Sequence, residues 1–387
     1  MSFGSPLFPL PTIFNGIEID MLSLGDADCL IVTKYENSFP HRILIDGGSA
    51  NAAEVIIDFM LRRKATEFWA AICTHAHNDH ASGLIKIVQD KRIKIQIAHM
   101  NDIRNHISAD ALRRAAASDD GVNEVLEKTK ELAAAFASRG VKVYRGFAGD
   151  YVGDWPKTTV LGPSLPFYKN ALKEFTKVDL PSPFSSLGSI LGGAPSSLAG
   201  LSGLAGIRAP YSTPLIPPPP STTTVDLSSL LTGALSRSSV KEKPKTQPFN
   251  NTSMILGVEF SGTRLLFTAD AGAEALDRVP AEWKNLAWLQ VPHHGSDGNL
   301  SQTNIERFCP KFAFISACGD SSHPSRAIVN GLIKCGADVC STHSSSHLWY
   351  YNGTVPARSD YGPAMRLKPT GDQDPVKWAE LLLGTQR

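Results

Sequence analysis

A short apolar run leads directly into a group of metal-binding side chains, and this junction constrains the fold more than any other part of the sequence. The run Phe-Trp-Ala-Ala-Ile-Cys predicts a buried strand, and residues 74–80 that follow it read Thr-His-Ala-His-Asn-Asp-His. His75 and His77 alternate, so both side chains can leave the same side of the strand end. Asp79 and His80 follow on the next turn and can point toward a second centre. Four nitrogen and oxygen ligands within six residues predict a site for one or two divalent metal ions.

The overall composition is that of a globular protein with one large α/β domain or two smaller ones. The chain has 387 residues, of which 42% are apolar and 19% charged. The formal net charge is +1, so a polyanion would have to be bound by a local patch or by the metals themselves. The N-terminus lacks a basic stretch followed by an apolar one, and no apolar run approaches the roughly 18–20 residues of a membrane helix. We therefore expect a cytoplasmic protein that makes no membrane contact.

Apolar strand patterns and helical patterns are mixed in both halves of the chain, which favours an α/β fold. Four segments show the helical period or the end signals of a helix: 51–63, 80–89, 121–139 and 325–335. Twelve segments are predicted as strands: 17–24, 29–34, 42–46, 68–73, 93–98, 141–145, 158–162, 252–260, 263–269, 286–291, 311–317 and 337–342.

Residues 181–240 form a low-complexity stretch between the two halves. The stretch is rich in Ser, Gly, Leu and Pro, has almost no charge and shows no clear period. It is either a floppy insertion in a surface loop, or a lid or contact segment for a second copy of the chain or a partner protein. The charged run that begins at Val240 is expected to return the chain to the surface. We therefore predict one domain over 1–343, interrupted by an insertion at 165–249, and a C-terminal extension at 344–387.

Polar residues with metal-binding potential recur at the ends of predicted strands. Asp46 ends an apolar strand and precedes two glycines, and Asp270 ends the second strand of a predicted hairpin. His293 and His294 directly follow another apolar strand. A rigid sheet can hold side chains at strand ends in a fixed geometry, as a catalytic site requires.

The order of these residues resembles the metal motifs of the metallo-β-lactamase superfamily. Asp46, the 74–80 motif, Asp270 and His293 occur in the same order as those motifs. Further segments resemble the C-terminal hydrolase domain of ComEC-type DNA-uptake proteins, over about 15–165 and 250–342, whereas their membrane channel has no counterpart here. These segments are Leu24-Gly-Asp26-Ala, Asn251-Thr-Ser253, Phe267-Thr-Ala-Asp270, Val291-Pro-His-His-Gly-Ser296 and Cys318-Gly-Asp-Ser-Ser-His323-Pro324.

The resemblance implies a four-layer αββα sandwich that binds two divalent metal ions, zinc or manganese. His75 and His77 would hold one ion, Asp270 would bridge both, and Asp46 would orient the ligands from behind. A hydroxide between the ions would attack a phosphodiester. His323 would contact the substrate phosphate or assist the leaving group, and Asp79 is the second residue expected to act in catalysis. The second ion would be held by Asp79, His80 and His293.

Several positions keep alternatives open. Many members of the superfamily supply a third histidine to the first ion; the candidate here is His99, and a water or the substrate is the favoured alternative. His294 could replace His293 as a ligand, and Asp26 could serve the site or merely stabilise its own turn. Basic residues near the motif either attract phosphates or form a solvated helix face: Arg62, Arg63, Lys64, Lys86, Lys91, Arg92 and Lys94.

The leading functional interpretation is a two-metal phosphodiesterase or nuclease that acts on DNA or another nucleic acid. A second interpretation is a small-molecule hydrolase of cyclic nucleotides, lactones or phosphoesters, with the insertion as its lid. A third is an interaction module that keeps its metals for structure, or a nuclease effector controlled by a partner protein. The presence of six metal-competent residues favours an enzyme over a module.

Overall fold

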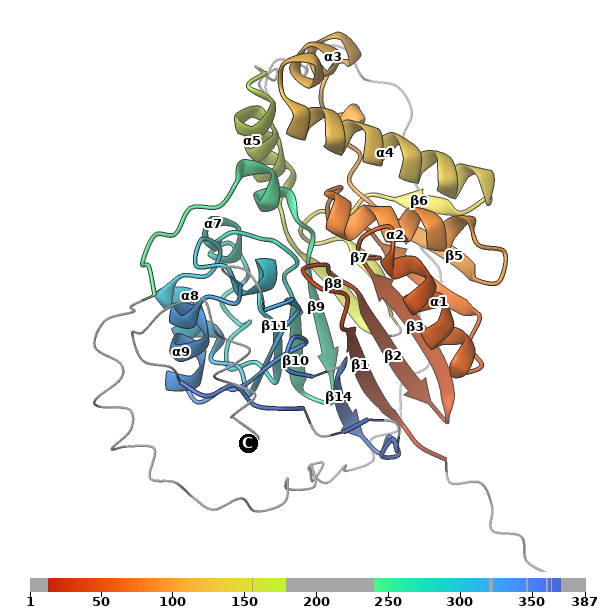
Figure 1. Cartoon of the computed structure of the whole chain (residues 1–387), viewed down its shortest axis with the longest axis vertical. Helices are drawn as coiled ribbons and strands as arrows, with labels where there is room; N and C mark the ends of the chain where they lie inside the picture. Colours follow the sequence, from red (N-terminus) through yellow and green to blue (C-terminus); the bar gives the residue numbers. More distant parts are fainter. Residues whose placement is uncertain are drawn as a thin grey trace, which may run out of the picture.

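Two seven-stranded sheets pack face to face between outer layers of helices in the computed structural model (Figure 1). The structure describes residues 13–369, apart from 155, 179–239, 320–322, 346, 360 and 363. The predicted four-layer α/β architecture is confirmed. The low-complexity stretch at 181–240 lies outside the described residues except for Val240.

The first sheet takes most of its strands from the N-terminal half, in the order β14-β1-β2-β3-β4-β5-β6. The strands from β14 to β3 are antiparallel neighbours, whereas β3, β4, β5 and β6 run parallel. Their bounds are β1 Gly16–Leu22, β2 Leu30–Glu36, β3 Phe39–Ile45, β4 Glu67–Ile72, β5 Lys94–His99, β6 Lys142–Tyr144 and β14 His347–Gly353.

The second sheet repeats this arrangement in the order β13-β12-β11-β10-β9-β8-β7. The strands from β7 to β10 are antiparallel neighbours, and β10 to β13 run parallel. Their bounds are β7 Tyr151–Asp154, β8 Lys157–Gly162, β9 Ile255–Phe260, β10 Thr263–Phe267, β11 Trp288–Gln290, β12 Phe312–Ile315 and β13 Asp338–Ser341.

Helices cover the outer faces of both sheets. In Figure 1, α1, α2 and α4 lie beside the first sheet, α7, α8 and α9 beside the second, and α3 and α5 at one end. The α-helices are α1 Ala52–Arg62, α2 Asn78–Gln89, α3 Ala109–Ser118, α4 Asp120–Ser138, α5 Leu165–Thr176, α7 Ala273–Leu276, α8 Gln302–Phe308 and α9 Arg326–Lys334. Three short 3-10 helices are η1 Ile103–Asn105, η2 Pro248–Thr252 and η3 His293–Gly295. Among the described residues, every helix is too short or too polar to cross a lipid bilayer.

Alternating side chains on the strands build separate apolar cores. On β1, Ile17, Ile19 and Met21 point into the core between the sheets, where they meet Trp288 and Phe314 from the second sheet. Separate clusters lie between each sheet and its helices and among α3, α4 and α5. Burial of both sheet faces explains why the strand segments of the sequence are so apolar.

The other face of β1 carries two buried carboxylates that anchor a segment near the C-terminal end of the described chain. Glu18 accepts hydrogen bonds from Tyr35, Arg63 and Trp349, and Asp20 accepts from Arg358 and Tyr361. β14 also pairs with β1 along its full length. Residues His347–Gly353, which lie within the predicted C-terminal extension, therefore complete the first sheet. β14 is not among the predicted strands, because the Ser-rich sequence before it obscures the alternation of its buried side chains.

A glycine pair lets α2 pack tightly against the turn after β3. A Cβ atom on Gly83 would lie 1.9 Å from the Gly47 carbonyl oxygen, and a Cβ on Gly47 would lie 2.2 Å from the Leu84 nitrogen. The amide of Gly47 donates to the His80 carbonyl at 2.8 Å. Because neither position tolerates a side chain, the first turn of α2 is held directly beside the turn that follows Asp46.

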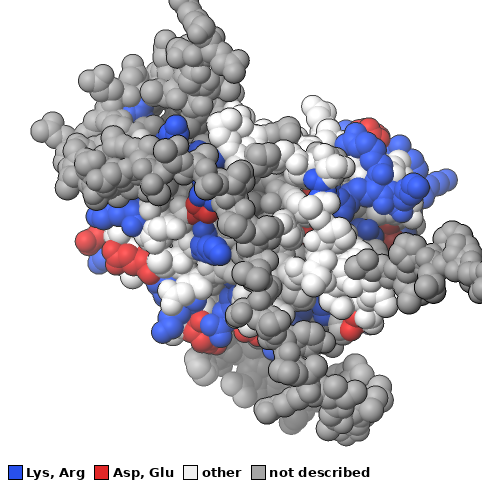
Figure 2. All heavy atoms as spheres, turned by 90° about the horizontal axis from the view of Figure 1, so that it is seen from below, with Lys and Arg blue, Asp and Glu red and all other residues white. Residues whose placement is uncertain are grey.

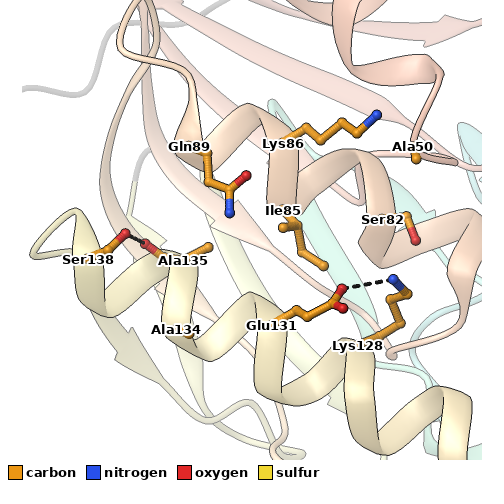
Figure 3. Close-up of a pocket in the computed structure, with 10 residues that line it drawn as sticks. All are labelled: Ala50, Ser82, Ile85, Lys86, Gln89, Lys128, Glu131, Ala134, Ala135 and Ser138. Atoms are coloured by element: carbon orange, nitrogen blue, oxygen red, sulfur yellow. Dashed lines mark hydrogen bonds and ion pairs between the residues drawn. The ribbon is translucent and has the colours of Figure 1, made fainter.

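The opposite side of α2 lines a groove of about 580 Å³ against α4 (Figure 3). Ile85 and Lys86 border it from α2, and Lys128 pairs with Glu131 across one turn of α4. The helix therefore presents His80 inward and a face of mixed apolar and charged side chains toward this groove.

Candidate metal centre

The predicted metal-binding residues meet at one edge of the sandwich. Asp46 follows β3, and residues 74–80 connect β4 to the first turn of α2. Asp270 follows β10, and the histidine pair 293–294 follows β11. All four strands belong to the parallel parts of their sheets, and the carboxyl ends of parallel strands meet at the same edge. Residues from the two halves of the sequence are thereby brought within a few ångströms of each other.

One cluster consists of His75, His77 and Asp270. The His75 Nε2 atom lies 3.0 Å from His77 Nδ1 and 3.7 Å from Asp270 Oδ2. His75 and Asp270 are buried, whereas His77 lies at the edge of the solvent. The separations of 3.0 Å and 3.7 Å lie on either side of the roughly 3.4 Å expected between two ligands of one tetrahedral ion, so the three residues could share a single ion.

A second cluster consists of Asp79, His80 and His294. The Asp79 Oδ2 atom lies 3.5 Å from His80 Nε2 and 3.4 Å from His294 Nε2. The other oxygen of Asp270, Oδ1, lies 3.4 Å from His80 Nε2. Asp270 therefore presents one oxygen to each cluster.

His293 turns toward the first cluster and not toward Asp79. Its Nε2 atom lies 3.7 Å from Asp270 Oδ2, the same oxygen that faces His75. Its Nδ1 atom lies 2.9 Å from Asn299 Oδ1. Both His293 and His294 have positive φ angles, 48° and 55°, so the backbone turns sharply and sends the two side chains to different places. The sequence favoured His293 as the ligand beside Asp79, whereas the structure places His294 there.

Two buried polar atoms in the clusters have no hydrogen-bond partner among the described residues, namely His80 Nε2 and Asp270 Oδ1. Such atoms are costly to bury unless something satisfies them. Two ligands that lie about 2.1 Å from one tetrahedral ion are about 3.4 Å apart. The separation of 3.4 Å between these atoms fits a divalent ion held by histidine nitrogen and carboxylate oxygen.

The protonation states agree with metal binding in one cluster and compete with it in the other. Burial, with His80 and His77 adding to it, holds the pKa of His75 well below its ordinary value, so its imidazole is neutral. Burial opposes protonation of His294 as well, but Asp79 and Asp28 raise its pKa to about 10. An ion entering the second cluster must therefore displace a proton from His294.

Asp46 holds the motif from behind. Its Oδ2 atom lies 2.8 Å from His80 Nδ1 and accepts from the Thr74 hydroxyl at 2.7 Å, while its Oδ1 accepts from the Thr74 amide at 2.8 Å. This carboxylate accepts the Nδ1 proton and so orients the ring of His80. This is the contact that an orienting role requires. Burial opposes protonation of His80, but Asp270 and Asp79 raise its pKa well above the ordinary value, so an ion must also displace the proton on Nε2.

Asp28 is a buried acidic residue that the sequence analysis did not select. Its Oδ2 atom accepts from Gln290 Nε2 at 2.9 Å, and its Oδ1 lies 3.9 Å from His294 Nδ1. It also groups with His80 and Asp270. Asp26, which was selected, instead accepts hydrogen bonds from the amide and thiol of Cys318. The one sequence signal that could have indicated the burial of Asp28 is its place two residues before the apolar strand β2.

The remaining candidate histidines lie around the clusters. His99 ends β5 with its Nδ1 atom 3.4 Å from the Arg145 carbonyl oxygen, and it belongs to no ligand group among the described residues. The ring centroid of the half-buried His323 lies 5.6 Å from that of His293 and 6.0 Å from that of His294. His323 is therefore next to the centre but outside both clusters.

An aromatic wall closes the first cluster on the side of α5. Phe249 of η2 is buried, with its ring centroid 5.0 Å from that of His77 and 5.8 Å from that of His75. Phe175 of α5 packs on the other side of Phe249 at 4.7 Å. Apolar rings at this position limit the access of water to the histidines.

The basic residues near the motif lie away from the centre. Figure 2 shows Lys and Arg side chains gathered on the right of the face seen from below, the side on which α1 and β5 lie in Figure 1. The predicted metal ligands follow the opposite ends of these parallel strands, about 20 Å away for a six-residue strand. The exposed basic residues at the far end include Arg62, Lys64, Lys91, Arg92 and Lys94.

Comparison with known proteins shows weak sequence similarity. No protein-family model matches the chain. Over 127 residues, or 32% of this chain, the sequence is 30% identical to ComE operon protein 3 of Bacillus subtilis (strain 168), and the match covers 16% of that protein. The chain therefore corresponds to a small part of that relative.

Similar solved structures include two proteins at low identity. The metallo-β-lactamase-fold protein YhfI from Bacillus subtilis is 9% identical over 87% of this chain and 100% of that chain, with a TM-score of 0.41. A diphosphatase from the PhnP family is 11% identical over 85% of this chain and 86% of that chain, with a TM-score of 0.34.

Proposed function

We propose that the chain is a metal-dependent hydrolase that cleaves phosphodiesters, with nucleic acid as its substrate class and two divalent ions, zinc or manganese, as cofactors. The observation that carries the proposal is the position of Asp270. It is buried between two clusters, with Oδ2 toward His75 and an otherwise unsatisfied Oδ1 toward His80. A carboxylate in this position suits two ions that share it as a bridge.

The proposed ligands divide between the ions according to these distances. The first ion would be held by His75 and His77, with His293 as the third histidine that the sequence analysis sought at His99. His293 Nε2 lies 3.7 Å from Asp270 Oδ2, and His75 Nε2 lies at the same distance from that oxygen. The second ion would be held by Asp79, His80 and His294, and Asp270 would complete both sites.

When bound, a pair of divalent ions lowers the pKa of water and neutralises the charge that builds up on a phosphodiester during in-line displacement. The protein positions the substrate around that pair. The Asp79 side chain is 33% exposed, and its second oxygen can accept a hydrogen bond from an incoming water molecule and so orient it. The side chain of His293 is 28% exposed and faces it across the centre, so the two residues mark the entrance for substrate.

His323 is proposed to contact the phosphate. Burial and the neighbouring His294 and His293 lower its pKa, so its imidazole is neutral near pH 7. A neutral imidazole donates one N–H hydrogen bond to a phosphate oxygen but has no extra proton for a leaving group. The neutral state of His323 therefore favours contact with the substrate phosphate over assistance to the leaving group.

The proposal is tested by measuring bound metal and hydrolysis on the same preparation. Purified protein is analysed for metal and assayed with Zn²⁺ or Mn²⁺ on a chromogenic phosphodiester, single-stranded, double-stranded and circular DNA, and RNA. We expect phosphodiester cleavage that chelation abolishes and metal restores. Turnover of a lactone or thioester, with failure on every phosphodiester, would favour the small-molecule interpretation instead.

Variants test the ligand assignment. His77→Ala and Asp270→Ala should each lose bound metal and activity, whereas His41→Ala, a histidine of β3 outside the ligand groups, should retain both. Full activity in the Asp270→Ala protein would exclude the bridging role.

A further inference from the structure

A short segment with three lysines lies beside the proposed metal centre. Residues 241–246 read Lys-Glu-Lys-Pro-Lys-Thr and lead into η2; we call them the lysine segment. Lys241, Lys243 and Lys245 are all exposed. The segment has a net charge of +2, twice the +1 of the whole chain, so it is a local exception to an almost neutral protein.

Several contacts hold the lysine segment next to the histidine pair. At its start, Lys241 Nζ pairs with Asp297 at 2.8 Å, and the Lys241 carbonyl accepts from the Gln302 amide at 3.3 Å. At its end, Thr246 Oγ1 accepts from Asn250 Nδ2 at 2.9 Å, and the same amide lies 3.3 Å from His293 Nδ1. The segment thus runs from the start of α8 to η2 beside the loop that carries His293 (Figure 1).

Two of the three charges are not neutralised by the protein. Within the described part of the chain, Lys243 and Lys245 form no ion pair. At the far end of the first sheet, by contrast, Arg92 is paired with Glu54 and Asp90, and Lys94 with Glu67. A lysine without an acidic partner retains its full attraction for a phosphate.

We propose that Lys243 and Lys245 bind the backbone phosphates of a single-stranded nucleic acid whose scissile phosphate occupies the metal centre. This inference rests on the proposed function and specifies its substrate. Pro244 between the two lysines fixes its own φ angle and disfavours helical backbone at Lys243, which limits the freedom of the segment before any ligand binds.

The recessed position of the ligands favours a single strand over a duplex. His75, His80 and Asp270 are each at most 5% exposed, and access is between the partly exposed Asp79 and His293. A phosphate in a flexible single strand can enter such a recess, whereas a rigid duplex with a major groove about 12 Å wide keeps its phosphates on a broad surface. The lysine segment then lies along the strand as it leaves the centre.

A double variant separates this role from the chemistry. Lys243→Gln/Lys245→Gln is compared with the control Lys91→Gln/Lys284→Gln, which removes the same charge from two exposed lysines far from the site. Both metal-loaded full-length proteins are assayed on a single-stranded oligonucleotide of about ten nucleotides and on bis(p-nitrophenyl) phosphate, which is too short to reach the segment.

Loss of two phosphate contacts should reduce the slope of log kcat/KM against log salt by about 1.4 for the oligonucleotide and raise its KM about tenfold near 0.15 M salt. The kinetics on bis(p-nitrophenyl) phosphate should not change, and the control variant should match the wild type on both substrates. An unchanged salt slope, an equal loss on the small substrate, or the same loss in the control would overturn the proposal.

Direct binding keeps this test separate from that of the proposed function. Fluorescence anisotropy of a labelled oligonucleotide with each metal-loaded protein reports affinity whether or not cleavage occurs. If no phosphodiester is cleaved but the Lys243→Gln/Lys245→Gln protein shows the reduced salt slope in binding, the proposed function fails and the lysine assignment stands. If cleavage occurs and binding is the same in all three proteins, the lysine assignment fails alone.

Discussion

Asp46→Asn is the sharpest test of how the fold prepares a ligand. Asp46 is 1% exposed and divides its two oxygens between separate tasks. Oδ1 accepts from the Thr74 amide, while Oδ2 accepts from the Thr74 hydroxyl and faces His80 Nδ1 at 2.8 Å. Asparagine can keep the first oxygen in place, so an NH₂ group replaces Oδ2 and meets His80.

The expected magnitude follows from the tautomer of His80. An amide donor opposite Nδ1 favours the tautomer in which Nδ1 accepts and Nε2 carries the proton, and a protonated Nε2 cannot bind an ion. Loss of a partner that orients a metal-bound histidine typically costs 10- to 100-fold in metal affinity. Because the wrong tautomer is actively stabilised here, we expect the upper end, about 100-fold or about 2.7 kcal/mol.

The assay is calorimetric or competitive titration of the metal-free protein with Zn²⁺ or Mn²⁺, together with denaturant unfolding to establish that each variant is folded. The matched control is Asp20→Asn, which replaces another fully buried carboxylate of the first sheet. Asp20 accepts from Arg358 and Tyr361 on the outer face of β1 and contacts no member of the metal clusters. We expect near wild-type metal affinity from this control.

Two results would refute the reasoning. A folded Asp46→Asn protein that binds both ions with wild-type affinity would show that His80 does not depend on its buried partner. An equal loss of affinity in Asp20→Asn would show that buried charge in the first sheet affects metal binding through general stability, and not through the orientation of His80.

Three further predictions follow from other parts of the structure. His294→Ala should lower the bound metal from two ions toward one, measured by elemental analysis, and two ions retained would contradict the placement of His294 beside Asp79. Gly83→Ala should destabilise the fold by about 3 kcal/mol in denaturant unfolding, because its Cβ would lie 1.9 Å from the Gly47 oxygen; wild-type stability would contradict this packing. Burial, with the charge of Glu18 adding to it, raises the pKa of Asp20 from 3.8 to about 6, so the folded protein loses stability as the pH rises through this interval. Asp20→Asn should remove at most about 3 kcal/mol of the difference in unfolding free energy between pH 4 and pH 7, and an unchanged pH profile would contradict the shift.

The sequence was most informative where strands end in polar residues. The apolar run before His75 became β4, and the predicted strands before Asp270 and His293 became β10 and β11. The glycines after Asp46 indicated a tight turn, which the close approach of α2 explains. These predictions succeeded because strand burial and turn chemistry are local properties of the sequence.

The sequence could not show that the side chains of His293 and His294 point toward different clusters. A strand-end argument favours His293, the first residue after the strand, but two successive left-handed residues turn the chain and send His294 toward Asp79. Asp28 was overlooked for a related reason, because its neighbours resemble a simple turn and its burial depends on Gln290 from the second sheet. Both features are set by tertiary packing, which no local pattern encodes.

The origin of the ligands in two sheets links metal binding to the stacking of the sandwich. Asp46 and the 74–80 motif come from the first sheet, whereas Asp270 and the histidine pair come from the second. Packed together, these groups leave the buried atoms Asp270 Oδ1 and His80 Nε2 without hydrogen-bond partners, which opposes the stacking. Because bound ions would remove this penalty only when the two sheets are in contact, metal should stabilise the interface between the halves more than either half alone. The apolar core between the sheets, which includes Ile19 and Trp288, must hold the sandwich together against this cost.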